Sequence, residues 1–175
     1  ASIESHAFSD CTSLVKVELS ENVTLIGDSA FNGCNSLTNL NLPESLTSVG
    51  SCIIRGTKIT SITIPKNVTK SNYFYNRGYN GALCGCTELR EVIFEEGMTI
   101  IPSYIMARSL YLSSVERVVI PNTVIEIGDE AFYNCIGLTS VNIPNKITSI
   151  GEHAFTGCKD LIEVKINNNT GKDIM

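Results

Sequence analysis

Tryptophan is absent from the chain, histidine occurs only twice, and just 18% of the residues carry a charge. The 13 Lys and Arg residues are spread over 175 positions without a cluster, and the formal net charge is −5. Because a nucleic-acid backbone requires a concentrated basic surface, we expect no nucleic-acid partner. No apolar run reaches the ~18 residues of a spanning helix, so we expect no membrane insertion in this segment.

Motifs that carry chemistry are missing as well. The sequence contains no G-x-S-x-G turn, no phosphate-binding P-loop and no C-x₂-C zinc spacing. We therefore expect a protein that is not an enzyme and has neither a metal site nor a cofactor. The chain is nonetheless 43% hydrophobic, which favours an ordered fold with a sizeable core over disorder.

An internal repeat of about 23 residues dominates the sequence. Segments 26–50 and 127–151 both run Ile-Gly-Asp-x-Ala-Phe, then a cysteine, then Leu-x-x-φ-x-φ-Pro, where φ is aliphatic. Seven units can be aligned; four match closely, whereas those within 50–127 are irregular, and one carries seven extra residues between Ser71 and Ala82. We predict a single domain over residues 1–175, cut from a longer array of such units.

The repeat resembles the BspA-like leucine-rich repeats, which occur in surface proteins of anaerobic bacteria and some protists. This resemblance implies an α/β solenoid, a curved right-handed coil with one parallel β-sheet on its concave face. Short helical turns or irregular segments are expected on the convex face, with Asp28 and Asp129 as N-caps of the helical turns. The resemblance also implies a secreted or cell-surface location.

Phenylalanine and cysteine recur with the repeat. We predict that four phenylalanines stack along the interior: Phe8, Phe31, Phe132 and Phe155. Five cysteines share one repeat position and are predicted to be small buried residues: Cys11, Cys34, Cys86, Cys135 and Cys158. Cys52 and Cys84 do not occupy this repeat position and lie in neighbouring units. A disulfide between them is possible, and the sequence alone does not decide whether they are bridged or free. His6 and His153 share a repeat position about 29 Å apart, too far to share one metal ion or substrate.

The outward positions of the predicted strands supply one candidate binding surface. Ile93 and Val119 are apolar and adjacent, and Glu91 and Arg117 beside them are placed to pair across the strands. An apolar patch with a charged rim is typical of the centre of a protein interface. The alternative, that β-branched residues are present because they favour strands, stays open.

The aromatic insertion supplies a second candidate. Its aromatic and basic residues are of the types that interfaces enrich: Tyr73, Phe74, Tyr75, Arg77 and Tyr79. Insertions in repeat proteins map to loops on one face, often the binding face. These side chains can equally serve to cover the degraded third unit, so recognition and packing are both kept as interpretations.

The leading functional hypothesis is a non-enzymatic protein-binding module. The family resemblance implies adhesion to host or extracellular-matrix proteins, which we expect to occur through the concave sheet face. One alternative is a structural stalk or spacer with no ligand of its own. Another is a glycan-binding module that stacks sugar rings on Tyr73, Tyr75 and Tyr79.

Overall fold

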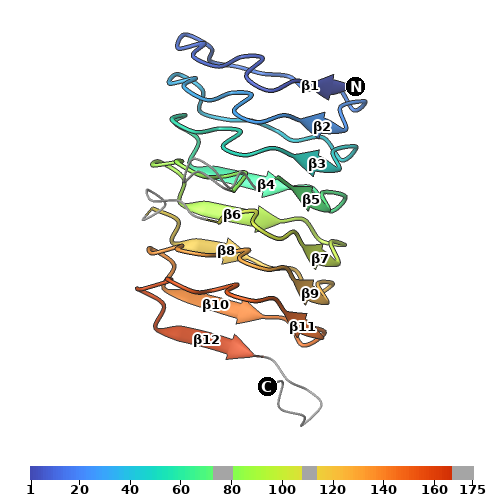
Figure 1. Cartoon of the computed structure of the whole chain (residues 1–175), viewed down its shortest axis with the longest axis vertical. Helices are drawn as coiled ribbons and strands as arrows, with labels where there is room; N and C mark the ends of the chain where they lie inside the picture. Colours follow the sequence, from blue (N-terminus) through green and yellow to red (C-terminus); the bar gives the residue numbers. More distant parts are fainter. Residues whose placement is uncertain (73–80, 108–113, 167–175) are drawn as a thin grey trace.

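The chain winds into a stack of coils with residues 2–3 and residues 163–166 at opposite ends (Figure 1). The computed structural model describes residues 1–72, 81–107 and 114–166. All pairing between its strands is parallel, as expected when each coil lies directly on the preceding one. The architecture is therefore a parallel β-solenoid of about seven turns, as the repeat count predicts.

Two rows of strands run along the stack, where a single sheet was predicted (Figure 1). The first row has the longer strands: β4 (Ser61–Ile64), β6 (Glu91–Phe94), β8 (Arg117–Val119), β10 (Ser140–Ile143) and β12 (Glu163–Ile166). The second row has two-residue strands: β1 (Ser2–Ile3), β2 (Leu25–Ile26), β3 (Ser48–Val49), β5 (Lys70–Ser71), β7 (Ile100–Ile101), β9 (Glu126–Ile127) and β11 (Ser149–Ile150). The second row comes just before the corner of each repeat, a position that the sequence pattern did not identify as a strand.

Both rows are interrupted. The longer strands form two separate sheets, β4-β6-β8 and β10-β12, and the short ones form β1-β2-β3-β5 and β11-β9-β7. Residues 16–19 and 39–42 occupy the long-strand positions of the first two coils but are not in strands. β4, β6 and β8 pair although their first residues are 30 and 26 positions apart, whereas β8 and β10, whose first residues are 23 positions apart, lie in separate sheets. Unit length therefore does not decide where a row is broken.

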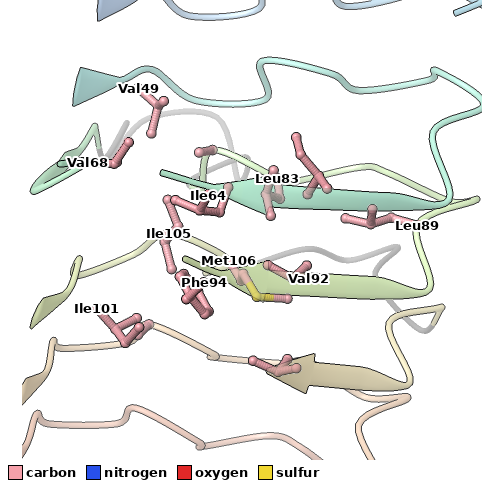
Figure 2. Close-up of a cluster of buried hydrophobic side chains, with 14 of the residues drawn as sticks. Val49, Ile64, Val68, Leu83, Leu89, Val92, Phe94, Ile101, Ile105 and Met106 are labelled. Carbon is pink, nitrogen blue, oxygen red and sulfur yellow. The ribbon is translucent and has the colours of Figure 1, made fainter. Parts of the chain in front are cut away.

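Side chains of the longer strands alternate between the interior and the solvent. In β4, Ile62 and Ile64 are buried while Ser61 and Thr63 are exposed. The same alternation places Val92 and Phe94 of the neighbouring strand inside, as the leucine-rich pattern predicts. The interior is a continuous aliphatic core shared by neighbouring coils (Figure 2).

The predicted helical turns are absent from the described residues, which contain no helix, so the α/β assignment is wrong for them. On the side opposite the longer strands, alternate main-chain N–H groups donate to the next coil, as Phe8 does to Ala30 O at 2.8 Å. The N–H groups between them donate within their own coil to the carbonyl group three residues earlier, as Ser9 N–H does to His6 O, and so form turns. Residues with positive φ recur in these segments, including His6 at 61° and Asp10 at 59°, and a right-handed helix cannot continue through them.

Because the described residues contain no helical turn to cap, Asp28 and Asp129 are not the predicted N-cap residues and have a different role. Each carboxylate accepts a hydrogen bond from the main chain of the following coil: Asp28 from Ser51 N–H at 2.7 Å, and Asp129 from Glu152 N–H at 2.8 Å. The glycine before each aspartate permits a close approach. A Cβ on Gly128 would lie 2.5 Å from Ser103 N of the preceding coil, closer than real Cβ atoms come.

The phenylalanine row forms two stacked pairs. Phe8 and Phe31 stack with ring centroids 5.4 Å apart, and Phe132 and Phe155 with centroids 5.0 Å apart. Phe94, which comes from a strand position, meets Phe132 edge-on at 6.0 Å. The predicted stacking is thus confirmed within each pair, and the irregular units between the pairs lack a phenylalanine at the repeat position.

Candidate functional site

The outward surface of β6 and β8 brings together four of the residues singled out from sequence. The register pairs Glu91 with Arg117 and Ile93 with Val119 on adjacent strands. Arg117 Nη1 donates to Glu91 Oε1 at 2.8 Å, which confirms the expected cross-strand ion pair. We call these four residues the β6–β8 patch.

The Glu91 carboxylate of the ion pair has a second donor. Ser61 Oγ of β4 donates to Glu91 Oε2 at 3.4 Å, so one carboxylate receives donors from both neighbouring strands. The Arg117 side chain is 71% exposed whereas that of Glu91 is 27% exposed. An exposed pair of this kind contributes about 0–1 kcal/mol to folding, which leaves its charges available to a partner.

The apolar half of the patch is only partly covered. Ile93 and Val119 are half-buried at outward positions, whereas Val92 and Val118, which alternate with them, are buried in the core. Their aliphatic surface therefore faces away from the interior, beside the ion pair. This is an apolar centre with charged groups at its edge.

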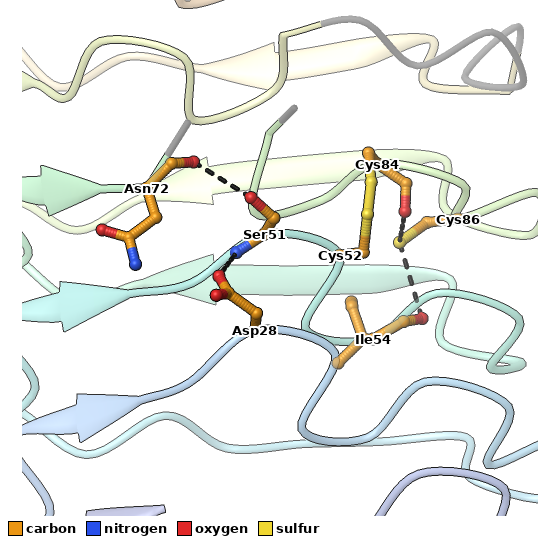
Figure 3. Close-up of a disulfide and its surroundings, with 7 residues drawn as sticks. All are labelled: Asp28, Ser51, Cys52, Ile54, Asn72, Cys84 and Cys86. Carbon is orange, nitrogen blue, oxygen red and sulfur yellow. Dashed lines mark hydrogen bonds between the residues drawn. A yellow bond between two sulfur atoms is a disulfide. The ribbon is translucent and has the colours of Figure 1, made fainter. Parts of the chain in front are cut away.

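The aromatic candidates lie outside the described residues: Tyr73, Phe74, Tyr75, Arg77 and Tyr79. Both ends of the segment they occupy are attached to the third coil. Asn72 N–H donates to Val49 O at 3.0 Å, and Ser51 Oγ donates to Asn72 O at 3.2 Å (Figure 3). On the other side, Cys52 N–H donates to Gly81 O at 2.9 Å.

A disulfide joins Cys52 to Cys84, whose Cα atoms are 4.8 Å apart (Figure 3). It closes a loop with a sequence separation of 32 that contains the insertion. The two cysteines outside the repeat row are thus the bridged pair. The bridge holds the third and fourth coils together at the point where the repeat is least regular.

The five repeat-position cysteines are free thiols. Their predicted burial is confirmed at three positions and is wrong for Cys11, because no earlier coil covers the first one in the described structure. Cys34, Cys86 and Cys135 are buried, whereas Cys11 in the first coil is exposed and Cys158 is half-buried. Cys34 Sγ donates to Phe8 O of the preceding coil at 3.1 Å, and Cys158 Sγ to Phe132 O at 3.2 Å. Burial raises the pKa of the Cys86 thiol to about 12, so it is a poor nucleophile.

Sequence reasoning missed two hollows on the long-strand side of the first three coils. One, of about 330 Å³, lies between residues 15–21 and residues 39–43. The other, of about 290 Å³, lies between residues 39–42 and Ser61–Thr63. Asn39, Asn41 and Leu42 line both, so we treat the hollows as one feature, the coil 1–3 groove. The available signal was the set of uncharged outward residues Asn39, Asn41, Ser61 and Thr63, which line the second hollow, whereas the first also has Lys16, Glu18 and Glu21.

Metal-ligating side chains do not gather anywhere in the described part of the chain, where no group of three His, Cys, Asp or Glu could hold an ion. Its two histidines, His6 and His153, are both exposed and lie in the first and last coils. The described residues also form no helix long and apolar enough to cross a membrane.

Comparison with known families identifies the repeat. The model of the BspA type leucine rich repeat region, in 6 copies, matches residues 1–115 and 103–172. The chain belongs to the BspA-type leucine-rich repeat family. Membership of this family suggests a protein-interaction module that lies at the cell surface or outside the cell. The fold of the family is typically non-enzymatic.

Solved structures of this BspA-type fold are similar over most of the chain. A leucine rich cell surface protein from Faecalibacterium prausnitzii is 26% identical with a TM-score of 0.67, and the match covers 97% of this chain and 43% of that one. A leucine rich repeat protein of T. pallidum is 25% identical with a TM-score of 0.52, covering 94% and 62%. The pneumococcal vaccine antigen PcpA, at 20% identity and a TM-score of 0.52, covers 97% and 51% and shares the fold. No curated protein matches the sequence.

The chain spans less than two thirds of each of these structures.

Proposed function

We propose that this BspA-type chain is a protein-binding module of a secreted or cell-surface protein and that its partner binds the long-strand face. The observation that carries the proposal is the β6–β8 patch. Half-buried Ile93 and Val119 offer an apolar centre, and the Glu91–Arg117 ion pair offers charge at its edge. Interfaces combine these two properties, with affinity from the apolar centre and orientation from the charges.

The kind of partner in this proposal is argued from the family and not from the β6–β8 patch. The F. prausnitzii relative is described as a cell surface protein, which supports an extracellular setting for this chain. The Cys52–Cys84 disulfide is consistent with that setting, because disulfides persist in oxidising compartments. Within this proposal, the partners are host or extracellular-matrix proteins and the function is adhesion.

Binding of the purified chain to immobilised extracellular-matrix proteins tests the proposal. Ile93→Asp places a carboxylate at the centre of the patch and should weaken binding by about 30-fold, the effect of losing an interface hot spot. Ile162→Asp is the matched control. Ile162 is an aliphatic residue that is 89% exposed and lies outside the patch, so its replacement should leave binding unchanged.

Three outcomes are distinguishable. Weakened binding by the Ile93 variant alone supports the β6–β8 patch. Equal binding by the parent chain and both variants would remove the patch from the proposal. If the parent chain binds none of the matrix proteins, adhesion is overturned and the spacer hypothesis becomes the better account.

A further inference from the structure

The coil 1–3 groove exists because the long-strand row does not pair there. Lys58 N–H donates to Leu37 O at 2.9 Å just before the strand positions of the second and third coils. Residues 39–42 then form no ladder with β4, which is an edge strand of its sheet. In the next coil, by contrast, all four residues of β4 pair with β6. The main chain on one side of β4 is therefore left without a neighbouring strand.

The two hollows of the groove differ in charge: Lys16, Glu18 and Glu21 contribute to the first, whereas the second, between residues 39–42 and Ser61–Thr63, is lined by uncharged residues alone. Asn39, Asn41 and Thr63 are exposed, and within the described part of the chain their side chains make no hydrogen bond. In the first hollow, Lys16 and Glu18 pair with each other. A ligand of the second hollow, which we take as the binding part of the groove, is selected by neutral donors and acceptors and not by charge.

The spacing of the two asparagines matches an extended polypeptide. Asn39 and Asn41 are two residues apart on an extended segment, which separates them by about 6.6 Å along the chain. Peptide groups that face the same way in an extended partner repeat with that same distance. Each asparagine amide offers one carbonyl acceptor and an NH₂ donor, the complement of a peptide N–H and C=O.

We infer that the coil 1–3 groove binds an extended, uncharged polypeptide segment, laid along the strands with its main chain hydrogen-bonded to Asn39 and Asn41. This inference rests on the proposed function, because it names the part of a protein partner that the long-strand face takes. The groove is continuous with the β6–β8 patch. Thr63 lies opposite Ile93 in the register, and Ser61 lies opposite Glu91.

A carbohydrate is the competing occupant and fits the groove less well. Sugar rings are commonly stacked on aromatic faces, and the residues that line the two hollows include no aromatic side chain. Recognition of a peptide main chain by the two asparagine amides needs no such platform, because each amide supplies an acceptor and a donor for it.

An array of short uncharged peptides, probed with the whole chain, provides the test. The best binder is then measured by fluorescence polarisation against three variants. Asn39→Ala/Asn41→Ala should weaken binding by about tenfold or more, since it removes both amides. Asn142→Ala is the matched control, because Asn142 holds the same outward position on β10, away from the groove. The third variant is Ile93→Asp.

A second probe isolates the main chain. The same peptide, N-methylated at alternate residues, keeps its side chains but loses the N–H donors on one edge. We expect it to bind about tenfold more weakly to the parent chain and to lose little further affinity for the Asn39→Ala/Asn41→Ala variant. A methylated peptide that binds the parent chain as well as the unmodified one overturns the inference.

The remaining outcomes separate this inference from the proposed function. Loss of binding in Ile93→Asp with full binding in Asn39→Ala/Asn41→Ala overturns the groove and leaves the proposed function standing. No binding to any peptide overturns the groove as well, and the matrix-protein experiment then decides the proposed function by itself. Binding on a neutral glycan array that the double variant abolishes assigns the groove to carbohydrate and overturns the peptide inference.

Discussion

Asp28 and Asp129 show how single residues hold one coil to the next. Each was expected to cap a helical turn of its own coil, and each instead accepts a main-chain N–H of the following coil. Glu95 acts in a similar way between the third and fourth coils. It replaces the proline that ends other strands, and its carboxylate accepts Lys66 N–H at 2.9 Å. Acidic side chains thus satisfy donors in the neighbouring coil that a solenoid would otherwise leave open.

The buried thiols make stability depend on pH. Burial raises the pKa of Cys86 from 9.0 to about 12, and that of Cys158 to about 11. Above pH 9 the unfolded chain loses these protons while the folded chain keeps them. The folded state then binds more protons, and the free energy of unfolding falls as pH rises. We expect a loss of about 1 kcal/mol at pH 10 for the fully buried Cys86, and a smaller loss for the half-buried Cys158.

Urea unfolding at pH 7 and pH 10 measures this effect. Cys86→Ala is the informative variant, because it removes one fully buried thiol and should reduce the pH-dependent loss by about 1 kcal/mol. Cys11→Ala serves as the control, since Cys11 is exposed. If both variants keep the full pH dependence of the parent chain, the buried thiols do not cause it.

At the scale of elements, the regular repeat was predictable and the connections between coils were not. Alternation in segments such as Ser61–Ile64 fixes which side chains face inward, because the side-chain period of a strand is two. The absence of helix was not predictable from that pattern. It depends on main-chain hydrogen bonds such as Phe31 N–H to Ile53 O, which form only once a neighbouring coil is present.

One part of the candidate site could likewise be predicted from the sequence, and another part could not. The outward positions of Glu91, Ile93, Arg117 and Val119 follow from the strand period, and their cross-strand pairing follows from aligning two repeats. The coil 1–3 groove could not be predicted, because it requires that residues 39–42 fail to pair with β4 although they match the repeat. Strands at equivalent repeat positions pair across steps of 30 and 26 residues, whereas residues 39–42 do not pair with β4 across a step of 22, so neither the local pattern nor the unit length indicates which coils pair.

The Cys52–Cys84 disulfide is the covalent link between elements, and its removal should weaken the array. For a sequence separation of 32, the loop-closure model gives a loss of about 3–4 kcal/mol in the free energy of unfolding. Urea unfolding with and without reductant measures the loss. A Cys52→Ala/Cys84→Ala variant should be insensitive to the reductant, since the five other cysteines are already free.

Thiol counting in denaturant checks the premise of that experiment. Five thiols are expected before reduction, and all seven cysteines after it. Seven thiols without reductant would show that the bridge is absent from the purified protein.

At the scale of the whole molecule, each coil is stabilised by contacts with the coils directly above and below it. The cost of a core substitution should therefore depend on where in the stack it is made. Phe132 is fully buried between two aromatic neighbours, with Phe155 at 5.0 Å and Phe94 at 6.0 Å. Phe8 holds the equivalent repeat position in the first coil, where it is 43% exposed and, among the described residues, stacks only on Phe31.

We expect Phe132→Ala to destabilise the chain by about 3–5 kcal/mol, the usual effect of removing a buried aromatic ring, and Phe8→Ala by only about 1 kcal/mol. Urea unfolding should be followed by circular dichroism and by tyrosine fluorescence, because a repeat array can lose its end coils before its centre. Phe8→Ala should then broaden the early part of the transition, whereas Phe132→Ala should move the main midpoint. Equal destabilisation by the two variants would contradict a solenoid stabilised by nearest neighbours.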